Sequence, residues 1–464
     1  MPRARWWVIG ALALLTISVV LLDATGVIFD DGAPQTPVVS VSPPPLPDAM
    51  SDLPASVTPT GATADPSIVH RIDGLLADAG LGSSVHAVVA PLADPEQTWA
   101  DVDGDEPAAP ASTLKLWTAA ATLDAFDPQQ RIATSVVWDE DSGTLVLVGG
   151  GDATLRVEPR EEIPDTAAGA ASLSALARRV ARELKASQTA DGPVRLDFDA
   201  SLFSGPAVSP DWEPGYVTSG VIAPVTALMV DYGMVDPPAL ARYPDPALAT
   251  VERFAELLDE RGVEVSGTPD AVEADDLPGA VPLAEVRSPQ VGDLVEQMLR
   301  NSDNQLAEAL GRLAAGAQGL PLSFGGAAKA VERAAKSRGV DMSDATVVDA
   351  SGLSREDRFS AGGLLEALHS AATDPSLAPI LSGLAVAGFD GTLADRYQSG
   401  RAADGAGLVR AKTGTLTGIS AEAGVATSCD GDLVAFVILA DAVPDTEAAR
   451  EVLDDVGASL TSCP

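Results

Sequence analysis

The chain has 464 residues, of which 46% are hydrophobic, so it is long enough to bury two or three hydrophobic cores of ordinary size. Its 67 acidic and 29 basic side chains give a formal net charge of −38, which repels phosphates and argues against nucleic acid as a partner. We therefore expect a multidomain globular protein with an acidic, solvated surface.

Residues 1–31 are predicted to be an export signal or a membrane anchor. Arg3 and Arg5 precede an uncharged apolar stretch of 17 residues, 6–22, which is long for a signal-peptide core and short for a membrane span. Both alternatives remain open, and the lack of an A-x-A-like cleavage site favours the anchor. No Lys or Arg lies between Arg5 and Arg71, so the positive-inside rule places the rest of the chain outside the cytoplasm, in a cell-wall or periplasm-like space.

Residues 32–66 are predicted to be a linker, since eight prolines lie between positions 34 and 59 and such a segment cannot pack a core. The next segment, 67–127, is predicted to be globular. Its hydrophobic periodicity predicts a helix, a two-stranded hairpin and a second helix, at 67–80, 85–92 with 97–102, and 112–126.

The middle of the chain, residues 128–282, has the pattern of a separate α+β insertion. Strands are predicted at 132–138, 144–148, 194–198 and 263–265, and helices at 171–185 and 250–261. This stretch contains no reactive constellation, so acidic residues such as Asp152 are expected to be structural.

Residues 283–464 are predicted to return to a helical region followed by a β-rich end. The helices are expected at 288–313 with a break at 300–304, at 327–338, at 360–372 and at 446–460. The strands are expected at 410–416, 419–427 and 433–439.

Ser112 and Lys115 form the first of three motifs that can carry chemistry. Residues three apart share a helical face, so the lysine amine can reach the serine hydroxyl. A serine needs a base to become a nucleophile, and a lysine can serve once burial or a second cation, such as Lys412, lowers its pKa. Taken alone, this spacing arises by chance too often to indicate function.

The second motif is Ser302-Asp303-Asn304, in the predicted break between helices. It supplies a hydroxyl for proton relay and an amide that can hold a peptide carbonyl, although by itself it is equally typical of a helix cap.

The third motif is Lys412-Thr413-Gly414-Thr415 on a predicted strand. Lys412 and Thr413 can bind a carboxylate, Gly414 permits close approach of another backbone, and the N–H of Thr415 can donate. The three histidines, His70, His86 and His369, provide neither a catalytic triad nor a metal cluster, so no cofactor or metal is expected.

In this order, Ser-x-x-Lys, Ser-x-Asn and Lys-Thr-Gly are the set found in penicillin-binding proteins and class A β-lactamases. The 186 residues between Lys115 and Ser302 are too many for a compact β-lactamase, and no E-x-x-x-N deacylation motif lies between Asn304 and Lys412. Residues 68–461 instead resemble the class C low-molecular-mass penicillin-binding proteins, the D-alanyl-D-alanine carboxypeptidase/endopeptidase family. Further stretches that resemble this family are 110–116, 148–152, Ala307-Glu308, 349–354 and 387–393.

The resemblance implies a penicillin-binding/β-lactamase-like α/β (α+β) fold, with a sheet flanked by helices. The catalytic domain would consist of residues 67–127 and 283–464, interrupted by the satellite insertion 128–282. Ala350 departs from the family's usual glycine or asparagine without affecting the chemistry.

The resemblance also implies a serine D-Ala-D-Ala carboxypeptidase, with possible endopeptidase activity, whose substrates are peptidoglycan stem peptides and whose inhibitors are β-lactams. Ser112 would attack the substrate and Lys115 would act as base. Ser302 would relay a proton to the leaving amine, and Lys412 would bind the terminal carboxylate. The substrate-binding residues would be Asn304, Thr413, Gly414 and Thr415. The alternatives are a catalytically silent wall-binding protein and a β-lactamase or esterase on the same scaffold.

Cys429 and Cys463 are the only cysteines, and export makes a disulfide between them plausible. If the helix at 446–460 packs antiparallel to the preceding strand, the short C-terminal tail brings Cys463 back to Cys429. We therefore predict this bridge.

Overall fold

The computed structural model describes residues 65–159, 171–187, 192–236, 240–277 and 279–463. The predicted export segment and almost all of the predicted linker lie outside these residues. Within these ranges, no helix combines the length and apolarity needed to cross a membrane.

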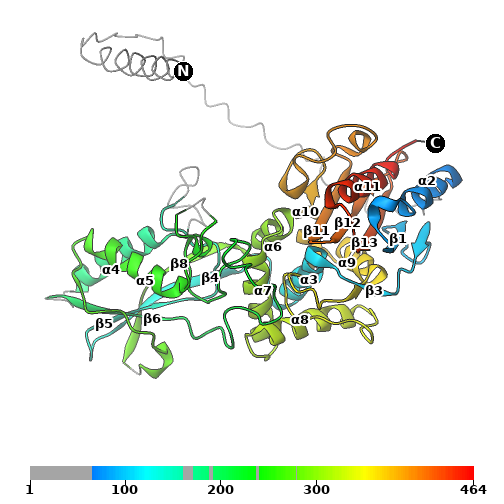
Figure 1. Ribbon diagram of the computed structural model, residues 1–464. Helices are drawn as coiled ribbons and strands as arrows, with labels where there is room; N and C mark the ends of the chain where they lie inside the picture. Colours follow the sequence, from blue (N-terminus) through cyan, green and yellow to red (C-terminus); the bar gives the residue numbers. More distant parts are fainter. Residues whose placement is uncertain (1–64, 160–170, 188–191, 237–239, 278, 464) are drawn as a thin grey trace, which may run out of the picture. The chain divides into compact units, whose positions relative to one another are not determined.

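An antiparallel sheet of six strands forms the centre of the catalytic part (Figure 1). Its strands, in spatial order, are β10 (Ala385–Val386), β11 (Val409–Leu416), β12 (Ile419–Thr427), β13 (Leu433–Asp441), β1 (Ser84–Pro91) and β2 (Ala100–Val102). Because β1 pairs with β13 along its whole length, the beginning and the end of the described chain belong to one sheet. The predicted hairpin of β1 and β2 and the three late strands are confirmed.

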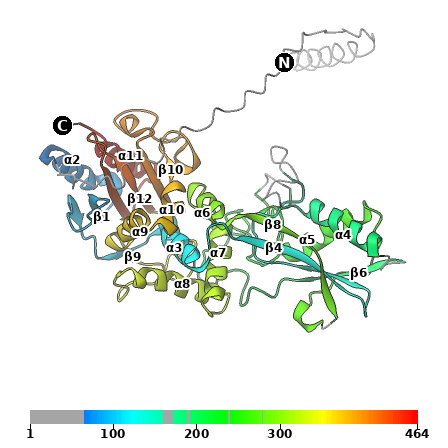
Figure 2. The same cartoon turned by 180° about the vertical axis from the view of Figure 1, so that it is seen from behind.

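Helices cover both faces of this sheet, as the views from the front and from behind show (Figures 1 and 2). On one face lie α2 (Pro66–Leu76) and α11 (Thr446–Ser459). The core on the other face includes α3 (Lys115–Ala125), α6 (Val291–Arg300), α7 (Asn304–Ala317), α8 (Phe324–Ser337), α9 (Ala361–Thr373) and α10 (Ala378–Ser382). Alternate residues of β13 face the two cores, so this strand is hydrophobic almost throughout.

The inserted region contains a second sheet with its own core. Its strands, in spatial order, are β7 (Val265–Ser266), β6 (Val194–Asp199), β5 (Thr144–Val148), β4 (Arg131–Asp139) and β8 (Ala280–Gln290). The helices α4 (Leu173–Ser187) and α5 (Pro246–Asp259) pack on one face of it (Figures 1 and 2). The predicted boundary at 282 falls inside β8, which pairs with β4 as far as Gln290 and leads directly into α6.

Short elements complete the fold. The strands β3 (Pro107–Ala108) and β9 (Phe359–Ser360) pair with each other. The 3₁₀ helices are η2 (Ala79–Leu81), η3 (Ala111–Leu114), η4 (Asp231–Gly233), η5 (Ala274–Asp276), η6 (Pro375–Leu377), η7 (Gly391–Leu393) and η8 (Ala402–Gly405).

The C-terminal helix α11 is joined to the sheet by the predicted disulfide. Cys429 lies in the turn between β12 and β13, and its Cα is 5.2 Å from that of Cys463, just beyond α11. The predicted bridge between Cys429 and Cys463 is therefore confirmed.

Candidate active site

Ser112 lies on a 3₁₀ turn directly before α3, and Lys115 is the first residue of that helix. The sequence predicted one helix from residue 112, whereas the structure has a 3₁₀ turn before α3. The first residue of this turn, Ala111, is in the left-handed region (φ 45°). This turn leaves the serine side chain partly exposed, while the lysine side chain is fully buried. The Lys115 ammonium donates to Ser112 Oγ over 2.9 Å, so the predicted pair is in contact.

Two further acceptors hold the amine of Lys115. Asn304 Oδ1 lies 2.8 Å away and the carbonyl oxygen of Ser351 lies 2.6 Å away. The three partners come from the turn before α3, the start of α7 and the loop 349–354. Together they fix the nitrogen next to the serine hydroxyl.

The second motif forms the turn between α6 and α7, as the sequence predicts. Asp303 caps α7, accepting from the N–H of Leu306 at 3.0 Å, so this residue does serve as a helix cap. Ser302, with φ 56°, is held in the left-handed region. Its hydroxyl accepts a 2.9 Å hydrogen bond from Lys412, so both lysines each contact one serine of the site.

The third motif lies on β11, beside the turn that carries Ser112. A Cβ atom on Gly414 would lie 3.0 Å from the carbonyl oxygen of Pro110 and 3.1 Å from Ala111 Cβ, which explains the glycine. The hydroxyl of Thr413 lies 2.9 Å from that of Thr392. Close packing of strand and turn thus brings the third motif next to Ser112.

The motifs meet in one cleft of about 640 Å³. It is lined by Ser112, Tyr216, Val221, Ser302, Asn304, Leu353, Thr392, Asp395, Arg396, Thr413, Thr415, Leu416, Thr417, Glu447 and Arg450. Lys115, Lys412 and Gly414 are buried behind its wall. The structure therefore brings together all eight residues that the sequence singled out.

Burial dominates the electrostatics of the two lysines. It lowers the pKa of Lys115 to about 8, and the carboxylates of Asp349, Glu308, Asp303 and Asp357 oppose this decrease. Burial also lowers the pKa of Lys412 well below its usual value, and the charge of Lys115 lowers it further. We expected the charge of Lys412 to lower the pKa of Lys115. Instead, the charge of Lys115 lowers the pKa of Lys412, and burial lowers the pKa of Lys115.

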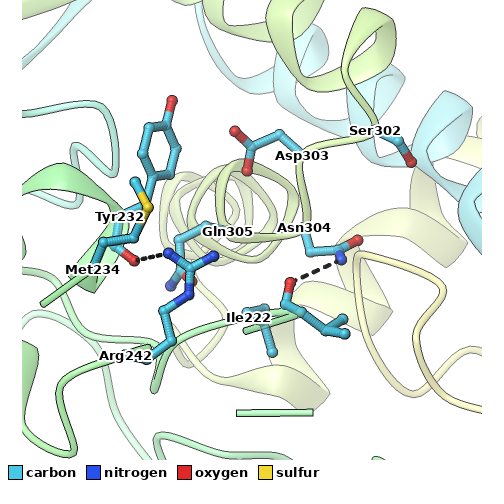
Figure 3. Close-up of a pocket in the computed structure, with 9 residues that line it drawn as sticks. Ile222, Tyr232, Met234, Arg242, Ser302, Asp303, Asn304 and Gln305 are labelled. Atoms are coloured by element: carbon cyan, nitrogen blue, oxygen red, sulfur yellow. Dashed lines mark hydrogen bonds between the residues drawn. The ribbon is translucent and has the colours of Figure 1, made fainter. Parts of the chain in front are cut away.

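A smaller cavity of about 220 Å³ lies on the other side of the turn 302–305, toward the insertion (Figure 3). The side chain of Asn304 donates to the carbonyl of Val221 over 3.3 Å, and the N–H of Ala223 donates to Gln305 Oε1 over 3.0 Å. Residues of the insertion thus support the turn that carries two of the predicted site residues.

Sequence reasoning gave no role to several residues that build the site. Glu308 and the loop 349–354 had been singled out only as stretches resembling the family. Glu308 Oε1 accepts from the N–H of Ala350 at 3.1 Å and pairs with Arg312, and burial raises the pKa of its carboxyl to about 7. The role of Ser351 is carried by its backbone carbonyl, which leaves no signal in a sequence.

Comparisons with known proteins agree with this geometry. A family model described as D-Ala-D-Ala carboxypeptidase 3 (S13) matches residues 68–244 and 236–462. The chain belongs to this family. It is 36% identical over 440 residues to carboxypeptidase DacB of Mycolicibacterium smegmatis, covering 90% of this chain and 91% of that protein. It is 34% identical over 468 residues to carboxypeptidase Rv3627c of Mycobacterium tuberculosis, with 98% and 96% covered.

Among solved structures, penicillin binding protein 4 from Haemophilus influenzae has the same fold, with a TM-score of 0.66 at 22% identity. The match covers 84% of this chain and 97% of that one. The predicted fold class and the predicted serine D-Ala-D-Ala carboxypeptidase are confirmed. Membership of this S13 family also implies action outside the cytoplasm, as the charges near the N-terminus predict.

Proposed function

We propose that Ser112 is the nucleophile of this carboxypeptidase and that Lys115 is its general base. The observation that carries the proposal is the 2.9 Å contact between Lys115 Nζ and Ser112 Oγ, made by a lysine that is fully buried. Because burial lowers its pKa to about 8, a usable fraction of the amine is neutral near pH 7 and can accept the serine proton.

In the acylation step, Ser112 Oγ attacks the carbonyl of the penultimate D-alanine of a peptidoglycan stem peptide, and its proton passes to Lys115. The N–H groups of Ser112 and Thr415 stabilise the oxyanion. When the intermediate collapses, the C–N bond breaks, and the proton reaches the leaving amine of the terminal D-alanine through Ser302. Water then attacks the ester and regenerates Ser112.

The other predicted residues bind and orient the substrate. Lys412 and Thr413 lie on β11, and in this proposal they bind the terminal carboxylate. Gly414 lets the strand lie close to Ser112. Asn304, which already holds Lys115, orients the substrate amide. Both Thr413 and Thr415 line the cleft, which supports this role.

We also propose the context in which the enzyme works. β-Lactams acylate the same serine; one fold relative is itself called a penicillin binding protein. Residues 1–31 carry the enzyme to the outer face of the membrane and anchor it there, and the linker 32–66 holds it away from the surface. The insertion, which begins near residue 128 and ends with β8 at Gln290, is a satellite domain that supplies no reacting group.

The test uses the full chain with a fluorescent penicillin and with a peptide ending in D-Ala-D-Ala. We expect D-alanine release, a single adduct mapped by mass spectrometry to the peptide that contains Ser112, and no adduct in Ser112→Ala. An adduct on another residue would refute the assignment. Labelling without D-alanine release would instead indicate a protein that binds but has lost turnover.

A further inference from the structure

Residues 211–216 of the insertion, which we call the Trp212 segment, pack against the loop 349–355 of the catalytic domain. The hydroxyl of Ser354 donates to the carbonyl of Asp211, and Glu213 forms an ion pair with Arg355. The indole N–H of Trp212 donates to Asp349 Oδ2 over 2.8 Å. The two segments are 137 residues apart in the sequence.

Asp349 organises the loop in which it lies. Its carboxylate is fully buried and accepts from the backbone N–H groups of Ser351 at 3.0 Å, Gly352 at 2.6 Å and Ser354 at 2.9 Å. The fourth donor is Trp212. A buried carboxylate depends on such donors, because each one that is lost leaves part of the desolvation cost uncompensated.

The loop that Asp349 organises in turn holds the active-site lysine. The carbonyl of Ser351 accepts from Lys115 over 2.6 Å, and the carbonyl of Ala350 accepts from Thr118, on the same helix, over 2.6 Å. A Cβ atom on Gly352 would lie 1.9 Å from the carbonyl oxygen of Ala111, so the loop also touches the turn that carries Ser112. A shift of this loop therefore moves both reacting residues.

Trp212 is well placed to lock the loop. It is 6% exposed, and its ring meets that of Phe324 edge-on at 5.0 Å, so the indole is held by a ring contact as well as by its hydrogen bond. Tyr216 of the same segment lines the catalytic cleft, but Trp212 is not among the described residues that line it. Trp212 therefore acts on the site indirectly, through its hydrogen bond to Asp349 and through the core that it shares with Leu353, and replacing the indole N–H tests the first of these routes.

We propose that Trp212 is a positioning residue of the catalytic centre, acting through Asp349 and the carbonyl of Ser351 on Lys115. The inference rests on the proposed role of Lys115 as general base. The insertion then contributes no reacting group, yet it controls where the base is held. A misplacement of about 1 Å in a reacting group can cost about a hundredfold in rate.

The pH profile reports on this role. The groups that face Lys115 are Asp349 and Asp357 from the loop region, Asp303 and Glu308 from the start of α7, and Lys412 on β11. Burial is what lowers the pKa of Lys115. A loosened loop admits water, so the acid limb of the rate profile moves to higher pH when Trp212 loses its hydrogen bond.

The experiment compares Trp212→Phe with Trp138→Phe in the full chain. Phenylalanine keeps an aromatic ring against Phe324, removes the indole N–H and is smaller than tryptophan; the control variant loses the same side-chain volume at a buried site. Trp138 is also buried in the insertion, but its indole N–H has no hydrogen-bond partner among the described residues, so its replacement breaks no bond. The rate of acylation by a fluorescent penicillin, peptide kcat and KM, and the melting temperature are measured from pH 6 to pH 10.

We expect Trp212→Phe to lower acylation and kcat about ten- to a hundredfold at pH 7, with KM changed less than about twofold and the acid limb moved to higher pH. Trp138→Phe should keep the acylation rate, the kcat and the pH profile of the parent chain. Rates and profile within about twofold of the parent chain in Trp212→Phe would overturn the inference.

Asp349→Asn, which leaves Trp212 in place, covers the case of a poorly folding Trp212→Phe protein: acylation lowered at least tenfold with the acid limb moved to higher pH supports the inference, and the parent rate and profile overturn it. Where Trp212→Phe folds, a double variant no slower than Asp349→Asn supports the inference, whereas additive losses overturn it. Lys115→Ala separates the two hypotheses. If Lys115→Ala retains full acylation, the proposed base is wrong; if it is inactive while Trp212→Phe is normal, only the positioning role fails.

Discussion

At the scale of single residues, the site depends on the contrast between a partly exposed serine and a buried lysine three positions later. The local spacing brings the two side chains to one face, and the surrounding protein changes the chemistry of the amine. Desolvation lowers the pKa of Lys115, whereas four carboxylates limit the decrease, so the value of about 8 is a balance between them. Part of the Lys115 population is therefore unprotonated near neutral pH, and the amine is still basic enough to take a proton from Ser112.

The first prediction is that acylation rises with pH up to about 8 and then levels off. Only the neutral amine of Lys115 accepts a proton, so each unit of pH below its pKa of about 8 lowers the active fraction roughly tenfold. A stopped-flow measurement of penicillin acylation between pH 6 and pH 10 checks this. A flat profile across that range would show that no group with this pKa limits the step.

The second prediction is that Lys115→Arg loses acylation by about 10²–10⁴-fold, since a guanidinium keeps its proton at every working pH. Lys336→Arg is the matched control, because Lys336 is exposed and pairs with Glu332 one turn earlier on α8. The control should be labelled at the parent rate. Retained labelling in Lys115→Arg would mean that another group activates Ser112.

At the scale of elements, the active site consists of chain segments packed backbone to backbone. The turn η3, the strand β11 and the loop 349–354 approach so closely that Gly352 has no room for a side chain and a Cβ atom on Gly414 would be in tight contact. Such contacts determine the position of Ser112 more narrowly than hydrogen bonds between flexible side chains could. The glycines in these elements are therefore part of the catalytic geometry.

The third prediction compares Gly352→Ala with Gly339→Ala. Both glycines have positive φ, 73° and 83°, so alanine pays about 1–2 kcal/mol for the left-handed conformation at either position. Only at 352 would the new Cβ meet another atom, the carbonyl oxygen of Ala111 at 1.9 Å; at 339 nothing lies within 4 Å. Gly352→Ala should therefore destabilise the protein by several kcal/mol, on the order of an overpacked core, and slow acylation.

Thermal melting and penicillin labelling of the two variants check this prediction. Gly339→Ala should lose only the conformational cost and retain the parent labelling rate. Equal losses of stability in both variants would show that the loop can move away from Ala111 without penalty, and the argument for tight backbone packing would fail.

At the scale of the whole molecule, the two ends of the described chain meet in one sheet. Strand β1 pairs with β13, the helices α2 and α11 share one core, and the disulfide attaches the tail to the turn between β12 and β13. The C-terminal segment thus covers one face of the sheet that carries Lys412 and is bonded to it. The insertion interrupts the sequence between Lys115 and Ser302 without interrupting this sheet.

The fourth prediction is that Cys429→Ser/Cys463→Ser lowers the free energy of unfolding of the catalytic domain by about 3–4 kcal/mol. The bridge spans 34 residues, and closing such a loop restricts the unfolded chain by about that amount in the chain-entropy estimate. Denaturant unfolding of the oxidised parent and the double variant measures the difference. The reduced parent is the control and should match the variant; equal stability of all three would contradict the prediction.

The sequence by itself determined the family, most elements and the disulfide, and it predicted eight site residues that the fold brings together. Ser112 and Lys115 are three positions apart, and Asp303 caps the helix that follows it. The late strands are alternately or continuously apolar. Each of these signals is local, because it depends on the identity of side chains that are near one another in the sequence. The order of the three motifs then identified the chemistry. Two cysteines in an exported chain left only one pairing to predict.

Only the tertiary structure decided how Lys115 is held. Lys115 contacts Asn304 across 189 residues and the carbonyl of Ser351 across 236, and Trp212 reaches Asp349 across 137. A backbone carbonyl is present at every residue, so its role as an acceptor leaves no mark in the sequence. Which carbonyl and which indole meet the site depends on how the loop and the insertion pack, and the depressed pKa of Lys115 follows from that burial.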